Sequence, residues 1–137
     1  MLNTMQLTMA YFDSKGLKYG TDEKRNVIEA GFPLENKGSI RIKIFFDDDD
    51  RTVGIRSFDY CAFPDEKKPA MYKACSLAND NYRWIKFSVD EDDNTITLAD
   101  DAVVQLDSCA EEILELMVRM VHIAGEAYPS FMKALWA

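Results

Sequence analysis

The chain has 137 residues, of which 47% are hydrophobic and 29% are charged. This composition is typical of a globular domain and excludes a disordered or fibrous chain. The formal net charge is −8, which repels phosphate backbones and anionic lipid surfaces. We therefore expect one domain over residues 1–137 that binds neither nucleic acid nor membrane.

The sequence also predicts a cytoplasmic location. Residues 1–12 lack a basic leader and an unbroken apolar run, so they do not resemble a signal peptide. The longest apolar-rich stretch, residues 113–124, contains charged side chains and is too short to span a bilayer. The three cysteines are odd in number and widely spaced, which suits neither a disulfide framework nor a zinc site with paired ligands.

Secondary structure is predicted from hydrophobic periodicity, caps and breakers. In chain order, the expected elements are a helix over 3–15, strands over 26–32, 39–46 and 52–63, a helix over 67–79, strands over 84–89 and 95–99, and a helix from 108 that breaks or kinks at 128–129 before a tail over 130–136. Asn3 is the expected cap of the first helix, and Gly16 is its expected end. In the third strand, the inward-facing apolar residues are odd-numbered at the start and even-numbered near the end. We therefore expect a bulge near Arg56 and Ser57.

This order predicts an α+β fold: a helix, three antiparallel strands, a helix, two strands and a C-terminal helix. It is similar to the order in type III secretion chaperones. The stretch Asn79-Asp80-Asn81-Tyr82-Arg83-Trp84-Ile85-Lys86-Phe87, the acidic turn after it and a terminal helix that ends near Tyr128-Pro129 resemble the bacterial YbjN-like family. The region from Phe32-Pro33 to Pro69 is also similar to that family. The resemblance implies a non-enzymatic sensory-transduction regulator or chaperone-like protein, often dimeric, with no catalytic residues to carry over.

No metal or cofactor is expected. Adjacent side chains in the aspartate run 47–50 diverge from one another, so a solvated turn is favoured over a cation site. Asp90, Asp92, Asn94 and Asp101 have the spacing of calcium ligands, but Thr95 stands where the calcium loop needs glycine.

The single histidine and the cysteines have structural interpretations. His122 has no sequence partner for catalysis and is expected to be half-buried, as a packing residue or a subunit contact. Cys109 begins a helix, but two nearby glutamates oppose thiolate formation, so we expect it to pack in the core. Cys61 and Cys75 also read as small core residues.

Two segments supply candidates for a protein-binding or dimer interface. Trp84 and Phe87 lie on opposite faces of a predicted strand, which would leave one of them available to a partner. The apolar arc of the last helix is wider than one sheet contact needs, which indicates burial on two sides, with a second subunit as one option. The candidates there are Met117, Met120 and Val121.

The leading hypothesis is a cytoplasmic, homodimeric binding module for a protein or peptide partner, with no catalytic residues. One alternative is a structural accessory subunit of a larger assembly. Another is a small carboxylate-based hydrolase that uses Asp59, Asp65 or Asp100 in a cleft.

Overall fold

A computed structural model describes residues 1–35 and 37–137. Its elements are α1 (Asn3–Lys15), β1 (Gly20–Asp22), β2 (Val27–Leu34), β3 (Lys37–Phe46), β4 (Thr52–Ser57), a 3₁₀ turn (Asp65–Lys67), α2 (Lys68–Asn81), β5 (Lys86–Asp90), β6 (Thr95–Val103) and α3 (Cys109–Trp136). The predicted α+β order is confirmed, with one addition. The short strand β1 lies between the first predicted helix and the first predicted strand, where no element is expected, and it pairs with the start of β2.

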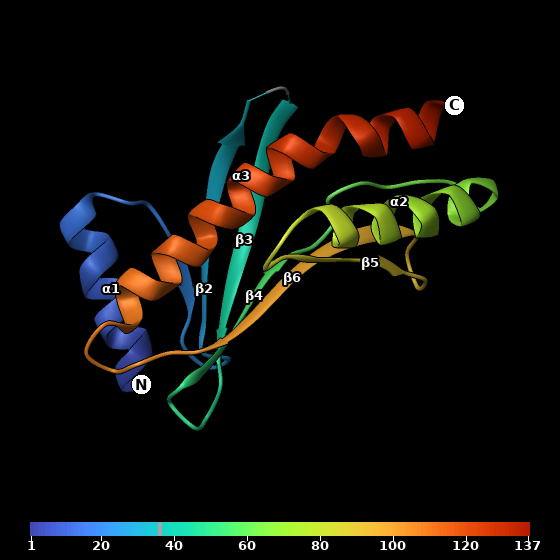
Figure 1. The fold of residues 1–137 in the computed structure, drawn as a ribbon. Coiled ribbons are helices and arrows are strands. Elements are labelled where there is room, and N and C mark those ends of the chain that lie inside the picture. The colour runs from blue at the N-terminus through green and yellow to red at the C-terminus, as the bar shows by residue number, and fades with distance from the viewer. Residues whose placement is uncertain (36) are drawn as a thin grey trace.

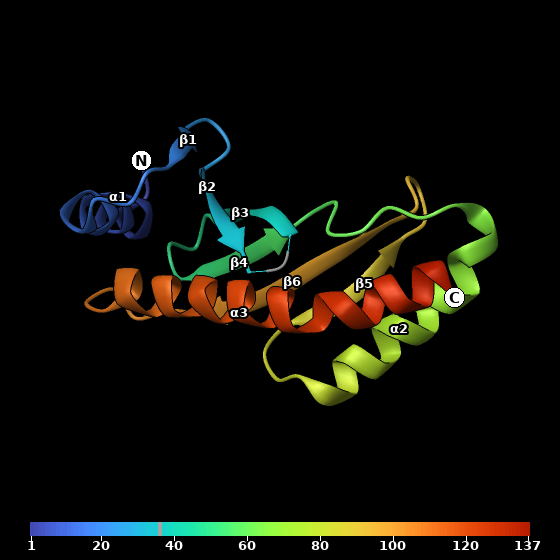
Figure 2. The same cartoon turned by 90° about the horizontal axis from the view of Figure 1, so that it is seen from above.

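The strands form one antiparallel sheet in the order β1-β2-β3-β4-β6-β5. Helix α3 crosses one face of this sheet, with α1 beside its first half and α2 beside its second half (Figures 1 and 2). The alternation predicted for residues 39–46 is confirmed, because Ile40, Ile42, Ile44 and Phe46 are all buried. None of the helices in the described part of the chain has both the length and the apolar composition that a bilayer-spanning segment needs.

The sheet divides into two diverging arms, the hairpin β2–β3 and the hairpin β5–β6 (Figure 1). Strand β4 joins them, but its pairing with β3 ends at Lys43 opposite Arg56. After Ser57 the chain turns through Asp59, whose φ is 60°, and the Tyr60 N–H donates to the Ile96 carbonyl at 3.0 Å. The prediction of one bulged strand over 52–63 is therefore wrong, because the chain leaves β3 and moves toward β6.

The start of α1 is capped from a distant part of the chain. The Asp50 carboxylate accepts hydrogen bonds from the Asn3 N–H at 3.1 Å, the Thr4 N–H at 2.9 Å and the Thr4 hydroxyl at 2.6 Å. Asn3 makes no side-chain cap, so that expectation is wrong. A carboxylate at a helix N-terminus satisfies free amides and interacts favourably with the helix dipole.

Helix α3 continues through Pro129 without a break. Its last turns take a different direction from the rest of the helix (Figure 1), as expected where proline removes one main-chain hydrogen bond. Phe131, beyond the bend, is fully buried against Tyr60 and Phe87. The wide apolar arc has an explanation within this chain, because α1, α2, β2 and β3 all pack on the helix.

Candidate functional site

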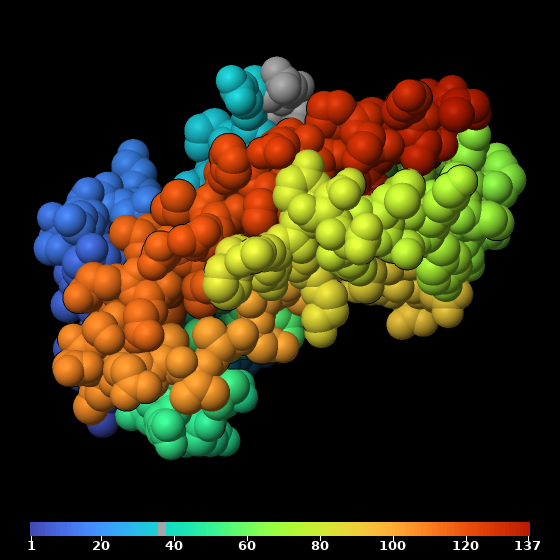
Figure 3. All heavy atoms as spheres, viewed as in Figure 1, coloured from blue at the N-terminus to red at the C-terminus, as the bar shows by residue number. Residues whose placement is uncertain are grey.

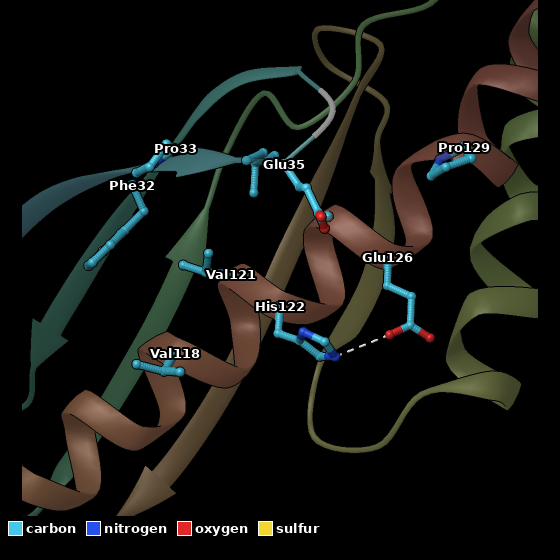
Figure 4. A pocket seen from close by; sticks show the side chains of 10 residues that line it. Phe32, Pro33, Glu35, Val118, Val121, His122, Glu126 and Pro129 are labelled. Atoms are coloured by element: carbon cyan, nitrogen blue, oxygen red, sulfur yellow. Dashed lines mark ion pairs between the residues drawn. The ribbon is translucent and has the colours of Figure 1, made fainter.

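A groove separates the hairpin β2–β3 from the outer side of α3. We call it the hairpin–helix groove, and its volume is about 610 Å³. Its lining comes from the end of β2 and from successive turns of α3: Phe32, Pro33, Leu34, Glu35, Val118, Val121, His122, Gly125, Glu126 and Pro129. Figure 4 shows Val118 and Val121 on the side of α3 that faces the hairpin.

Helical periodicity explains how α3 supplies one wall of this groove. Residues 118, 121, 125 and 129 are three or four positions apart and share one side of the helix. The hairpin covers part of this side, because Leu34 of β2 lies near Gly125 and both Val121 and Gly125 are half-buried. Helix α3 is visible along its length in the space-filling view (Figure 3). The Val118 side chain is 55% exposed, which is unusual for a valine on a central helix.

The rim of the groove is polar and mainly acidic. His122 Nε2 lies 3.1 Å from Glu126 Oε2, one helical turn further on, and both side chains are exposed (Figure 4). Glu35 from the hairpin is exposed as well. Exposed pairs such as His122–Glu126 contribute little to stability, at most about 1 kcal/mol. The expectation of a half-buried His122 is wrong, because α3 turns this position toward solvent.

The structure separates the five candidate interface residues predicted from sequence. Val121 lines the hairpin–helix groove. Trp84 is 57% exposed on the other flank of α3. Phe87, Met117 and Met120 are buried in the core of the chain itself, so they support the surface without forming it. Burial of Met117 and Met120 follows from the central position of α3 between the sheet and the other helices.

Trp84 lies in a second, smaller hollow of about 250 Å³ between α3 and the end of β6. Its backbone is left-handed, with φ at 76°, which is rare for a bulky residue. The Arg119 guanidinium lies 5.5 Å from the centroid of the Trp84 ring and also pairs with Glu115 at 3.0 Å. Trp84 is therefore exposed because it lies in the turn before β5. The prediction that Trp84 lies on a strand, with Phe87 on the opposite face, does not explain its exposure.

Sequence reasoning missed Val118 and the hairpin residues of the groove. Val118 continues the apolar stripe of α3, so nothing in the periodicity distinguishes it from core positions. Phe32 is the last residue of the strand predicted over 26–32, and Pro33 follows it. The distance between the hairpin arm and the helix decides which of these side chains stay exposed, and that distance is a tertiary property.

The carboxylates considered for acid–base chemistry do not meet in one cleft. Asp59 is exposed beside the hairpin, and Asp65 accepts a hydrogen bond from the Asn94 side chain at 2.5 Å. Asp100 is buried on β6, opposite Ile55 of β4. Burial raises the pKa of Asp100 to about 6, with a further increase from Asp101 and an opposing effect of Arg56. One perturbed carboxyl without a second catalytic group does not make an acid–base site.

The acidic turns and the thiols have structural contacts. Among residues 1–35 and 37–137, no three His, Cys, Asp or Glu side chains converge as metal ligands. In the aspartate turn, Asp49 accepts hydrogen bonds from the Thr52 hydroxyl and from the N–H groups of Thr52 and Arg51, and these bonds lower its pKa. Cys61, Cys75 and Cys109 are buried. Burial raises the pKa of Cys75 to about 12, and burial also shifts the pKa of Cys109 upward.

Comparison with solved structures supports the fold. The chain is similar to YbjN from E. coli, described as "a putative transcription regulator", with a TM-score of 0.65, 12% identity and 92% of each chain covered. It is also similar to a chain of the ExsC–ExsE complex, with a TM-score of 0.56, 11% identity and coverage of 89% of this chain and 90% of the other. For the HopA1–SchA chaperone–effector complex, the TM-score is 0.50 at 11% identity, with 90% and 95% covered.

The fold is thus that of the type III secretion chaperones, as the order of elements predicts. No curated protein is significantly similar to the chain by sequence. A family model described as "Putative bacterial sensory transduction regulator" matches residues 9–132. These relatives are described as regulators and as members of chaperone complexes, which are non-enzymatic kinds of protein. The match extends from α1 nearly to the end of α3, and the chain therefore belongs to the YbjN family.

Proposed function

We propose that the chain is a non-enzymatic protein-binding module that holds a segment of a partner protein in the hairpin–helix groove. The observation that carries this proposal is the partly open apolar wall of α3, on which Val118 is exposed within the groove. Two solved structures of similar fold are complexes of two proteins, one of them a chaperone with its effector. We further propose that the protein works in the cytoplasm as a homodimer.

The groove is suited to one or two apolar side chains of a partner. Complete burial of one leucine-sized side chain contributes about 1.5–3 kcal/mol. A micromolar complex needs about 8 kcal/mol. The groove therefore supplies the anchor of the interaction, and neighbouring contacts supply the remainder.

The test places a photo-crosslinking amino acid at residue 118 in living cells. A partner held in the groove gives a discrete crosslinked product at this position. The matched control carries the same amino acid at Lys24, which is exposed in the turn between β1 and β2, outside the groove. A second variant, Val118→Asp with the crosslinker at 121, is expected to lose the product, because a carboxylate does not enter an apolar groove without a large desolvation cost. Equal products at 118 and 24, or none at 118, would contradict the proposal.

A further inference from the structure

The hairpin β2–β3 has an unpaired edge on the side away from β2. Strand β3 pairs with β2 along its whole length, from Ser39 opposite Pro33 to Phe45 opposite Val27. Its pairing with β4 begins only at Lys43. Continuation of the same register would place Phe58 opposite Arg41 and Tyr60 opposite Ser39. The chain instead turns away at Asp59, so no strand of the described chain pairs with this part of β3 on that side.

The direction of the main-chain groups along β3 follows from two hydrogen bonds. The Phe46 N–H donates to the Asn26 carbonyl, on the β2 side, and the Asp47 N–H donates to the Thr52 carbonyl, on the β4 side. Main-chain groups alternate in an antiparallel ladder, so those of Ser39 and Arg41 point to the β4 side. Neither residue has a main-chain hydrogen bond on that side to any part of the chain that the structure describes.

A hollow of about 340 Å³ lies beside this edge, between β3 and the segment that follows β4. Ser57 lines it, and the Ser57 hydroxyl is buried without a hydrogen-bond partner among the described residues. The surface that lines this hollow is mainly polar, whereas the surface that lines the hairpin–helix groove is mainly apolar. A free strand edge beside a polar hollow matches the main chain of an extended peptide, which offers donors and acceptors at the same spacing.

The charges beside the edge favour an acidic segment. Arg41 pairs with Glu29 across β2 and β3, whereas Lys43 has no carboxylate partner among the described residues and lies over the Phe58 ring at 5.9 Å from its centroid. The hollow is therefore lined by two cations, Arg41 and Lys43, and by two carboxylates, Glu29 and Asp59. Arg41 is already paired with Glu29, so Lys43 is the cation that can pair with a carboxylate of a bound segment. The same cations would repel the edge of a second copy of this hairpin, which carries them too. Asp59, on the opposite wall, is exposed at the mouth of the hollow.

We propose that the free edge of β3 at Ser39–Arg41 binds an extended peptide segment by main-chain pairing, with a carboxylate side chain of that segment beside Lys43. The inference rests on the protein-binding function proposed above and assigns a second site and a chemical class of partner. Edge strands in isolation are open to unwanted pairing, and the unpaired charge of Lys43 favours segments that carry a carboxylate at this position.

The experiment selects binders from a displayed library of seven-residue peptides on the intact protein and on Lys43→Glu. The wild type is expected to enrich peptides with Asp or Glu, and Lys43→Glu is expected to enrich Lys or Arg at the same position. For a selected acidic peptide, Lys43→Gln should weaken binding about two- to fivefold, the range for an exposed charge pair. Thermal unfolding of each variant verifies that it is folded.

A pair of variants at Ser39 tests the main-chain contact. Ser39→Pro removes the N–H that points away from β2 and leaves the pairing with β2 intact. It should weaken the peptide about three- to tenfold, the contribution of one hydrogen bond, whereas Ser39→Ala should have no effect. Selected peptides without an acidic preference, or insensitive to both Lys43→Glu and Ser39→Pro, would overturn the inference. Peptides that respond only to Val118→Asp would overturn it and leave the proposed function standing.

Discussion

Asp100 is the residue at which burial and charge conflict most clearly. It lies on the helix-facing side of the sheet and is 9% exposed, with one carboxylate oxygen lacking a hydrogen-bond partner among the described residues. Its pKa of about 6 in the folded chain lies above the ordinary value of about 3.9 expected in the unfolded chain. The folded state therefore binds the proton more tightly, and this group lowers stability as the pH rises from about 4 through 6.

We expect Asp100→Asn to be more stable than the wild type at pH 7.5, by about 1–2 kcal/mol. The difference should shrink toward pH 4, where the wild-type carboxyl is protonated in the folded state. Urea unfolding at both pH values measures it. Asp48→Asn, in the exposed turn, is the matched control and should stay within about 0.5 kcal/mol of the wild type. A variant less stable than the wild type at pH 7.5 would show that the charged carboxylate has a stabilising partner.

At the scale of elements, the last turns of α3 are held by an aromatic cluster. The Phe131 ring stacks on Phe87 with centroids 5.4 Å apart and meets Tyr60 edge-on at 5.5 Å. The Tyr60 hydroxyl also donates to the Ala124 carbonyl at 2.6 Å, just before the bend at Pro129. The bend therefore directs the end of the helix onto the β5–β6 arm, and packing outweighs the cost of a proline within the helix.

Phe131→Ala is expected to destabilise the chain by about 3–5 kcal/mol, because it removes a fully buried aromatic ring and leaves a cavity. Trp136→Ala is the matched control. It removes a larger ring from the same helix at a position that is 78% exposed, and should change stability by no more than about 0.5 kcal/mol. Thermal or urea unfolding compares the two. Similar losses for both would mean that the end of α3 buries Trp136 against a second copy of the chain.

At the scale of the whole molecule, exposed apolar side chains are found on both flanks of α3, among other places on the surface. Val118 borders the hairpin–helix groove, whereas Trp84 and Val103 border the smaller hollow at the end of β6. Leu106, shortly after β6, is exposed too. We assign the first flank to the partner and the second to the proposed dimer contact, because an exposed tryptophan with neighbouring aliphatic side chains is typical of interface centres.

Light scattering over a concentration series is expected to give about twice the monomer mass of 15.7 kDa. Trp84→Gly should shift the protein to the monomer, and glycine tolerates the left-handed backbone at this position. Tyr72→Ala, a comparably exposed aromatic position on α2, serves as the control and should leave the mass unchanged. A monomer at all concentrations of the wild type would remove the dimer from the proposal.

Local patterns in the sequence were sufficient to predict most of the helices and strands. The alternation over residues 39–46 depends only on which side chains avoid water, so it predicts the strand and its buried face. Gly16 ends α1 in a left-handed conformation, as glycine at a helix C-terminus does. The stretch around Trp84 and the order of elements led to the family, and the match over residues 9–132 confirms it.

Contacts between distant residues were decided only by the tertiary structure. Asp50 caps α1 across 46 positions of sequence, and the departure of the chain after Ser57 leaves β3 with a free edge. Phe87, Met117 and Met120 are core residues whereas Val118 is exposed, although all four are apolar. The physical reason is that periodicity reports how apolar a face is. It does not report how much of that face the chain's own elements cover.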